Sequence, residues 1–492
     1  MVLATPPFNL YFLGWIGLVP LFFALRTPAR QGFGEGFTAG FVYNAGLLYW
    51  LALNNGTDWY AALATMLATT CILAFGWGLG AWLWRRLFER FGELAWWILP
   101  FSWTAWEGLL GYLGELAFPW PLLALTQARF DPLLQIMEFT GVWGVSFWVA
   151  AMNVAVYHTW KGPIPKARRY GFLCFVVLAL IPPFAIWHAT SHYHKDAPTA
   201  RVMVVQGNIP PLEKWTMGPG YSFAVYDSLT RAGSARGIDL AVWPETAVPF
   251  NLLRQSFFRE KLTVLASEAN VSIITGASDH VRVAGEPKPL NAAFLIDPIK
   301  GPVERGAKRQ LVPLGERVPF QWIFPSLGKL NLGQAEFIPG PRWTLFDVIT
   351  SAQDTLRFPA LICYESAFGF LTREYVSRGA NFLVTVSNDA WYGWSSEAAQ
   401  INALSRFRCI ETRRAMARAS NSGISLICDQ LGREIAQTKL FKTEIAAGII
   451  PICTEETFYV RHGDLFLVVV TIIYGAALLA AVRVRKGDAK SE

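Results

Sequence analysis

The sequence predicts two fold classes in one chain: an α-helical transmembrane bundle and an α/β layered domain. Hydrophobic residues make up 53% of the 492 residues and charged residues only 16%, whereas soluble proteins carry about 25% charged residues. Long apolar runs fill the first part of the chain, and short β-branched runs between polar turns follow from Ala200 to about His462. We therefore expect a helical bundle over 1–195, an α/β domain over 196–462, and a closing helix with a basic tail over 463–492.

The apolar runs are long enough to cross a membrane, because about 18 apolar residues in a helix span the hydrocarbon core. Glu107 and Glu138 lie within or beside these runs and are expected either to serve function or to form hydrogen bonds inside the bundle. The stretch Leu116–Pro132 reads either as an interfacial segment near a lipid substrate or as a connecting loop. The seven runs are Phe8–Leu25, Gly36–Leu53, Trp59–Leu83, Leu94–Leu113, Leu133–Tyr157, Tyr170–Trp187 and Leu465–Val482.

Basic residues gather on one side of the predicted membrane. They cluster after the first, third, fifth and last runs, whereas the loop Asn54–Asp58 has none. Basic loops favour the cytoplasm, so the α/β domain and the N-terminus are expected on the opposite side. This placement also accounts for the net charge of +7 and argues against nucleic acid as a partner. The clusters are Arg26 and Arg30; Arg85, Arg86 and Arg90; Lys161, Lys166, Arg168 and Arg169; and Arg483, Arg485, Lys486 and Lys490.

The region after Ala200 alternates short strands with amphipathic stretches, which indicates an α/β layered domain. Helices are predicted over Arg254–Ala269 and Ala398–Ala417. Chemistry in such folds gathers at strand ends, where side chains are exposed but held by a rigid sheet. The predicted strands are Arg201–Val205, Leu240–Trp243, Val271–Thr275, Ala293–Ile296, Ala360–Ile362, Phe382–Val386 and Ile424–Cys428.

Three reactive residue types follow these strands: Glu245, Lys308 and Cys363. A cysteine nucleophile needs a base to take its proton and a cation near the developing oxyanion, roles that a glutamate and a lysine can fill. Each residue taken alone is weak evidence, since a cysteine after a strand is usually structural and a single charged residue is usually solvated.

The surrounding motifs resemble the three signatures of the nitrilase superfamily, in chain order. They are Trp243-Pro244-Glu245, Lys308 with Val312-Pro313-Leu314-Gly315-Glu316, and Cys363-Tyr364-Glu365. The resemblance implies an α-β-β-α sandwich. The flanking membrane runs extend it to the apolipoprotein N-acyltransferase family over nearly the whole chain. Further matching segments are Val205–Pro210 with Lys214-Trp215, Pro6-Pro7-Phe8, Phe118-Pro119-Trp120 and Ser387–Gly393.

The resemblance implies a two-step acyl transfer. Cys363 would be the nucleophile that takes an acyl chain from a phospholipid, Glu245 the general base, and Lys308 the group that stabilises the tetrahedral intermediates. The acyl chain would then pass to the α-amino group of an S-diacylglyceryl-cysteine apolipoprotein. Supporting roles would fall to Glu316, Tyr364 and Glu365, and substrate contacts to Trp215, Trp391, Tyr392 and Asn388.

The resemblance also implies a donor, a location and the absence of a cofactor. The donor would be phosphatidylethanolamine, and the chain would lie in the bacterial inner membrane with the catalytic domain on the periplasmic side. No metal or organic cofactor is expected. The sequence departs from the family in three places. Six predicted spans precede the domain where seven are usual, and Arg317 follows Glu316 where an aromatic residue is common. In addition, Ser366-Ala367-Phe368-Gly369 replaces a more apolar run after Cys363-Tyr364-Glu365.

Two other functions share parts of this pattern. A membrane-tethered amidohydrolase would use the same Glu-Lys-Cys triad on a small amide, with water as acceptor. A non-catalytic membrane scaffold would carry a degenerate domain, against which the intact triad argues. His188, His192 and His194 form a small cluster, interpreted as a solvated linker rather than a metal site because no acidic or cysteine ligand accompanies them. Cys409 is interpreted as a packed residue.

Overall fold

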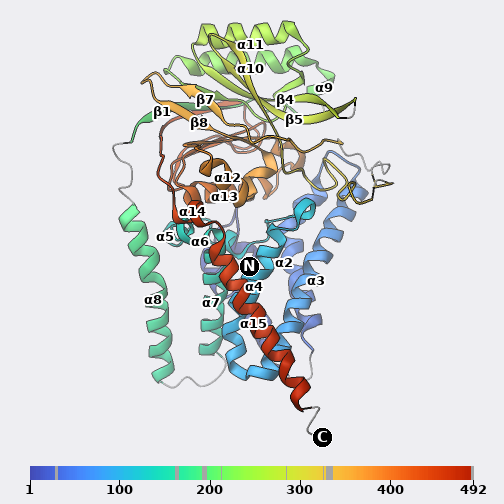
Figure 1. Cartoon of the computed structure of the whole chain (residues 1–492), viewed down its shortest axis with the longest axis vertical. Helices are drawn as coiled ribbons and strands as arrows, with labels where there is room; N and C mark the ends of the chain where they lie inside the picture. Colours follow the sequence, from blue (N-terminus) through green and yellow to red (C-terminus); the bar gives the residue numbers. More distant parts are fainter. Residues whose placement is uncertain are drawn as a thin grey trace.

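The computed structural model describes residues 1–27, 31–160, 166–190, 197–211, 213–283, 285–324, 326–327 and 336–488. The α/β elements gather at one end of the molecule and the long helices at the other (Figure 1). The last helix, α15, runs back along the helical region, so that its end lies at the far end from the sheets.

The helical region combines long helices with short turns of 3₁₀-helix. Among the described residues, Trp59–Gly111 is the one helical stretch long and apolar enough to cross a membrane, while Tyr11–Leu25 and Leu465–Ala481 are shorter apolar helices. The α-helices are α1 (Val19–Leu25), α2 (Phe33–Leu48), α3 (Trp59–Phe91), α4 (Ala95–Gly111), α5 (Asp131–Leu134), α6 (Met137–Thr140), α7 (Val142–Trp160), α8 (Lys166–Thr190) and α15 (Leu465–Asp488). The 3₁₀-helices are η1 (Val2–Ala4), η2 (Tyr11–Trp15), η3 (Tyr49–Leu53), η4 (Gly92–Leu94), η5 (Gly114–Leu116) and η6 (Leu123–Gln127).

Three of the predicted spans are not single helices. The run Gly36–Leu53 divides into α2 and η3. The run Phe8–Leu25 divides into η2 and α1. Gly14 of η2 packs closely against Thr126, because an added Cβ would lie only 2.6 Å from the Thr126 hydroxyl oxygen. The run Leu133–Tyr157 becomes helical without a break only from Val142, because Gly141 adopts a φ of 62° that interrupts the helix. Apolar composition predicted all three runs, and tertiary packing decided where the helices begin.

The α/β region holds two larger sheets and a two-stranded ribbon. The first sheet has the order β14-β1-β2-β4-β5-β6 with β3 beside β4, the second β13-β12-β11-β10-β9, and β7 pairs with β8. The strands are β1 (Thr199–Gln206), β2 (Leu240–Val242), β3 (Val248–Asn251), β4 (Ser272–Val283), β5 (Glu286–Asp297), β6 (Gly301–Ala307), β7 (Phe346–Ile349), β8 (Thr355–Phe358), β9 (Ala360–Ile362), β10 (Leu383–Ser387), β11 (Met416–Ser420), β12 (Leu426–Cys428), β13 (Glu434–Gln437) and β14 (Glu444–Pro451).

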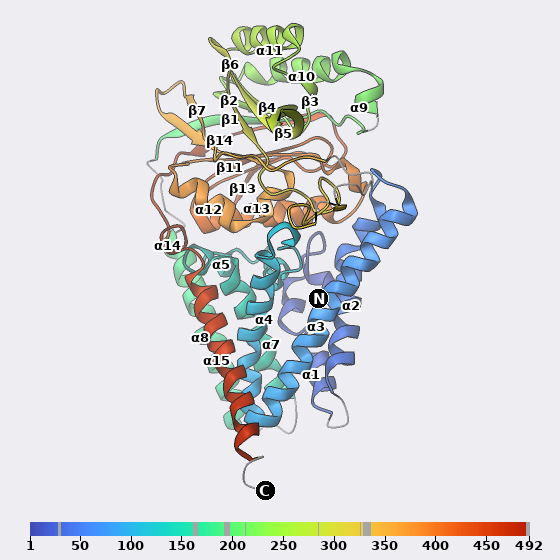
Figure 2. The ribbon, with the colours of Figure 1, turned by 45° about the vertical axis from the view of Figure 1, so that its right-hand side comes forward.

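Helices cover the outer face of each sheet, and the layers run helix, sheet, sheet, helix (Figures 1 and 2). One outer layer holds α10 and α11, and the other holds α12 and α13, which face the helical region. The sandwich expected from the resemblance is therefore confirmed. The helices of this region are α9 (Glu213–Thr216), α10 (Pro219–Ser234), α11 (Ser256–Ala269), α12 (Gly369–Ser377), α13 (Glu397–Thr412) and α14 (Phe458–His462), with η8 (Cys363–Ala367) and η9 (Asp389–Tyr392).

The predicted helix Ala398–Ala417 is too long. Helix α13 ends at Thr412, because Arg413 adopts a left-handed φ of 50°, and Ala417 lies inside strand β11. Strand β11 pairs with β10 on one side and with β12 on the other. The hydrogen bonds of a central strand therefore override the helical propensity of this alanine- and arginine-rich stretch.

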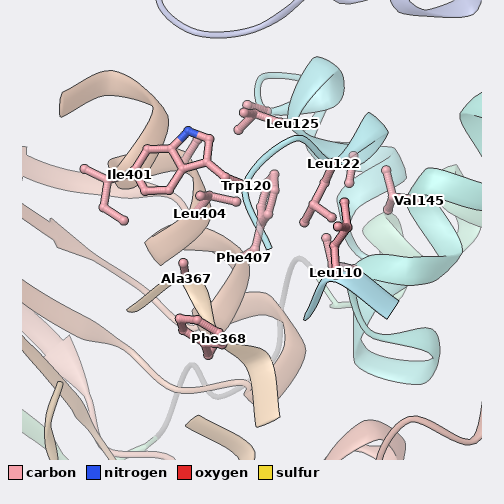
Figure 3. Packing of buried hydrophobic residues seen from close by; sticks show 14 of the residues in the cluster. Leu110, Trp120, Leu122, Leu125, Val145, Ala367, Phe368, Ile401, Leu404 and Phe407 are labelled. Carbon is pink, nitrogen blue, oxygen red and sulfur yellow. The ribbon is translucent and has the colours of Figure 1, made fainter. Parts of the chain in front are cut away.

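Two of the apolar cores of the molecule place the site. One lies between the two sheets and includes Val204, Val242, Ile362 and Val384. The other joins the α/β domain to the helical region, and Figure 3 shows its residues coming from both sides. Leu404 and Phe407 of α13 and Phe368 belong to the domain side, and Leu110 and Trp120 to the helical side. The two regions thus share one core.

Candidate active site

The cysteine lies on a sharp turn between a strand and a helix. Strand β9 ends at Ile362, and Cys363 begins η8 with a φ of 52°, a left-handed conformation that a residue with a side chain rarely adopts. Such strained backbone occurs where the surrounding structure holds a functional side chain in place. The thiol is mostly buried. It is therefore presented at the end of a buried parallel strand in a fixed position.

The lysine lies at the end of β6, and a carboxylate holds its ammonium. Lys308 Nζ lies 2.9 Å from Glu316 Oε2 and 3.9 Å from Glu245 Oε1, and the side chain is only 1% exposed. Glu316 also accepts a bond of 2.8 Å from the Val312 N–H, which closes the loop around the lysine. The Val-Pro-x-Gly-Glu segment thus places Glu316 next to Lys308.

The glutamate after β2 is held by an amide. Asn291 Nδ2 donates to Glu245 Oε1 at 2.6 Å and to Glu316 Oε1 at 3.1 Å. The Asn291 carbonyl also accepts the Lys308 N–H at 2.8 Å. Asn291 therefore positions both carboxylates and the lysine backbone. No sequence motif pointed to it, because it lies within the long strand β5.

Glu365 and Tyr364, the neighbours of the cysteine, bind other parts of the site. Glu365 accepts hydrogen bonds from the N–H groups of Arg309 at 2.7 Å, Gln310 at 3.1 Å and Ile362 at 2.8 Å. The carboxylate thus joins the segment from Lys308 to Arg317, here called the lysine loop, to the turn at Cys363, here called the cysteine turn. The Tyr364 hydroxyl donates to the Ala117 carbonyl at 2.7 Å, which ties the same turn to the helical region.

The electrostatics favour a neutral thiol and a charged lysine. Burial, followed by the nearby Glu245 carboxylate, raises the pKa of Cys363. Burial alone would lower the pKa of Lys308, but Glu316 and Glu245 outweigh it, so the pKa is raised and the ammonium stays charged. Burial raises the pKa of Glu245 more than Lys308 lowers it. The raised pKa makes the Glu245 carboxylate a stronger base than an ordinary glutamate.

Two of the four predicted substrate residues, Trp391 and Tyr392, contact the helical region. The Tyr392 ring lies 4.8 Å from the Trp50 ring, and the Trp391 carbonyl accepts the Asn55 N–H at 2.8 Å. Asn388 is buried and its side-chain oxygen accepts a bond from Asn421 Nδ2. Trp215 lies in α9, and its side chain lies outside the described part of the chain.

Two further groups beside the site carried no predicted role. Asp389 forms a fully buried ion pair with Arg418 at 2.9 Å and accepts bonds from Ser387 and Ser420. Lys214 is 2% exposed, its ammonium has no hydrogen-bond partner among the described residues, and burial lowers its pKa to about 8. The Lys214-Trp215 motif was a sequence signal for this lysine. Asp389 lies in the matching segment Ser387–Gly393, but nothing in the sequence paired it with Arg418.

No metal cluster is found within the described ranges, where no group of three or more His, Cys, Asp or Glu side chains could hold an ion. His188 lies in α8, and His192 and His194 lie outside the described residues. Cys409 is buried, as expected, and its sulfur lies 3.2 Å from that of Cys428.

Comparison with known proteins identifies the family. Residues 1–155 match the model of the apolipoprotein N-acyltransferase N-terminal domain, and residues 201–453 match the carbon-nitrogen hydrolase model. An apolipoprotein N-acyltransferase of Geobacter metallireducens is 32% identical over 99% of this chain and 94% of its own length. The chain belongs to the apolipoprotein N-acyltransferase family. It is therefore an N-acyltransferase.

A second apolipoprotein N-acyltransferase agrees with this assignment. An apolipoprotein N-acyltransferase of Chlorobaculum tepidum is 32% identical over 98% of this chain and 94% of its own length. Among solved structures, an amidase from Nesterenkonia sp. aligns with a TM-score of 0.40 and 15% identity, covering 55% of this chain and 94% of its own.

Proposed function

We propose that the chain moves an acyl chain from a phospholipid to the N-terminal α-amino group of an S-diacylglyceryl-cysteine apolipoprotein, through a thioester on Cys363. The observation that carries the proposal is the arrangement of the candidate triad. The Lys308 ammonium lies between the carboxylates of Glu316 and Glu245. Glu365 ties the lysine segment to the turn at Cys363, and Tyr364 ties that turn to the helical region. Phosphatidylethanolamine is the proposed donor.

In the first step Glu245 takes the thiol proton and the Cys363 sulfur attacks the ester carbonyl carbon of the donor. The oxyanion forms beside the Lys308 ammonium, which Glu316 holds in place. The carbon–oxygen bond then breaks, and Glu245 gives its proton to the leaving lysophospholipid alkoxide. The enzyme is left with a thioester and an ionised Glu245.

In the second step the acceptor amine attacks the thioester carbon. Glu245 takes a proton from the nitrogen, the carbon–sulfur bond breaks, and the proton passes to the Cys363 sulfur. The product is an amide and the enzyme returns to its starting state. Dividing the reaction in two means that the two lipid-bound substrates need not bind at once.

The helical region has a physical role in this reaction. Drawing an acyl chain into water costs about 0.8 kcal/mol for each CH₂ group, so a site at the membrane surface avoids most of that cost. We propose that 1–195 is a multi-pass bundle of the bacterial inner membrane, that 196–462 is the periplasmic catalytic domain, and that 463–492 is a closing helix with a cytoplasmic tail. The apolar stretch Trp59–Gly111 supports a membrane location.

The test uses the full chain in detergent with a phospholipid that carries a labelled acyl chain. Label that is bound to the protein, released by hydroxylamine, absent in Cys363→Ala and transferred to a diacylated lipopeptide amine supports the proposal. Cys71→Ala is the matched control, because Cys71 is an exposed thiol in α3. Release of free fatty acid or attack on small amides, without transfer to an amine, would support the amidohydrolase alternative. Absence of any thioester on folded protein would support the scaffold.

A further inference from the structure

A cavity of about 220 Å³ lies between the end of α4 and the lysine loop, whereas about 15 Å³ is enough for one water. Gly114 and Glu115 line it from the helical side, and Arg309, Gln310 and Arg317 from the domain side. The two sides are joined directly: Gln310 Nε2 donates to the Gly114 carbonyl at 3.2 Å, and Glu115 accepts the Phe320 N–H.

The cavity adjoins the triad along the chain. Arg309 follows Lys308 and Arg317 follows Glu316, so each arginine comes directly after one partner of the ion pair that holds the catalytic lysine. The N–H groups of Arg309 and Gln310 bind Glu365, which fixes the cavity wall to the cysteine turn. Glu365 therefore connects the cavity wall to the turn that carries Cys363.

The charges in the cavity are only partly satisfied. Arg309 is held against the Trp343 ring at 4.0 Å and donates to the Gly340 carbonyl. Arg317 forms no ion pair or side-chain hydrogen bond with any described residue, and its Nε is buried without a partner. Glu115 forms no ion pair with a described residue either. Among the described residues, the cavity thus offers a guanidinium without a side-chain partner and a carboxylate that accepts one backbone N–H but has no ion pair.

The cavity lies next to an apolar surface, as a site for a lipid headgroup would. The cavity begins three residues after the apolar stretch that ends at Gly111, and Figure 2 shows α4 rising to the loops of the α/β domain at this point. Leu109, Leu113 and Leu116 are 50%, 40% and 43% exposed beside it. Acyl chains can lie against these leucines while the headgroup reaches the charged cavity.

We propose that this cavity is the headgroup subsite for the donor phospholipid, in which Arg317 binds the phosphodiester and Glu115 binds the headgroup ammonium. Arginine is suited to phosphate because its planar guanidinium donates two parallel hydrogen bonds. Only the glycerol backbone separates the phosphate of such a lipid from the ester that Cys363 attacks. The inference rests on the proposed function, since it requires a phospholipid donor.

The test compares three donors with the same labelled acyl chain, in detergent with the full chain: phosphatidylethanolamine, phosphatidylglycerol, which lacks the ammonium, and diacylglycerol, which lacks the phosphate. Thioester formation on Cys363 gives KM and kcat for each donor. Arg317→Gln is expected to raise KM for both phospholipids about tenfold and to remove their advantage over diacylglycerol. Glu115→Gln is expected to make the KM values for phosphatidylethanolamine and phosphatidylglycerol equal. Both KM values should stay below the KM for diacylglycerol.

Controls separate the subsite from the reaction itself. Arg317→Lys keeps the charge, so its KM for the phospholipids should lie between those of wild type and Arg317→Gln. If Arg317 were only structural, the change in KM would not depend on the donor headgroup. Arg254→Gln, an exposed arginine just before α11 on the far side of the domain, should leave all three KM values unchanged. If wild type forms no thioester with any phospholipid, the proposed function fails.

Two results would overturn the subsite alone. In the first, wild type reacts but Arg317→Gln keeps the same KM ratio between phosphatidylethanolamine and diacylglycerol. In the second, inorganic phosphate inhibits wild type and not Arg317→Gln while the headgroup has no effect, which would assign the cavity to a free anion.

Discussion

The core between the two sheets and the core at the junction with the helical region differ in how they fix the parts they join. The core between the sheets is made of apolar side chains, such as Val204, Val242 and Val384, brought together by strand pairing. The junction with the helical region adds buried polar contacts: Gln400 Oε1 accepts the indole N–H groups of Trp50 at 3.2 Å and Trp120 at 2.7 Å.

The junction also uses charged groups. Arg413 of the domain pairs with Glu138 at 2.7 Å, and Glu411 accepts the Val142 N–H at 2.9 Å. Apolar packing is non-directional, whereas a buried hydrogen bond has a preferred distance and angle. The inter-sheet core therefore mainly supplies stability, and the junction sets the orientation of the catalytic domain relative to the helices.

The largest effect is expected at the catalytic edge of the sandwich. Glu245→Gln keeps the shape of the side chain and an acceptor for Asn291 but removes the base, so the rate of thioester formation should fall by about 10²–10⁴-fold. Single-turnover labelling measures this rate. Glu260→Gln, an exposed glutamate of α11, is the control. A rate close to that of wild type would contradict the assignment of Glu245 as base.

The buried ion pair beneath the site should dominate stability. Arg418→Met leaves the Asp389 carboxylate buried without its cation, which is expected to lower the free energy of unfolding by about 3–5 kcal/mol. Denaturant unfolding in detergent measures the change. The matched control is Arg357→Met, whose pair with Asp347 is about half exposed on both sides and should cost less than about 1 kcal/mol. Equal losses in the two variants would show that burial does not matter here.

A smaller effect is expected at the junction. Gln400→Leu keeps the volume but leaves the Trp50 and Trp120 indole groups and the Leu47 carbonyl without their partner, at a cost of about 2 kcal/mol. Because the Trp50 ring contacts Tyr392, acylation should slow as well. Unfolding and single-turnover labelling report the two effects, with exposed Gln255→Leu as control. An unchanged rate with reduced stability would limit Gln400 to a structural role.

The smallest effect concerns pH. Burial raises the pKa of Glu245, so the acidic limb of the pH–rate profile should lie above the ordinary glutamate value of about 4.3. Asn291 donates a hydrogen bond to the carboxylate and lowers this pKa, so Asn291→Leu should move the limb to still higher pH. The rate is lost as the pH falls, because the protonated acid cannot act as base. An acidic limb that stays in place or moves to lower pH in Asn291→Leu would show that the limb does not report the pKa of Glu245.

Much of the site could be predicted from its motifs. The residues Glu245, Lys308 and Cys363 follow strands in short segments of characteristic composition, so local sequence carries the information. Asn291 could not be predicted, since a single asparagine in a long strand is unremarkable until β5 and β6 pair and bring it to the two carboxylates. The same holds for Arg418 and Asp389, which meet only through the pairing of β10 with β11.

The sequence by itself determined the order of the parts: an apolar helical region, an α/β domain with reactive residues at its strand ends, and a final apolar helix. These features depend on composition and on periodicity along the chain, which neighbouring residues decide. Only the tertiary structure decided that the chain turns at Gly141 and Arg413, and that a charged cavity lies where Glu115 meets Arg317. Those outcomes depend on contacts between segments far apart in sequence, where burial and hydrogen bonding outweigh local preference.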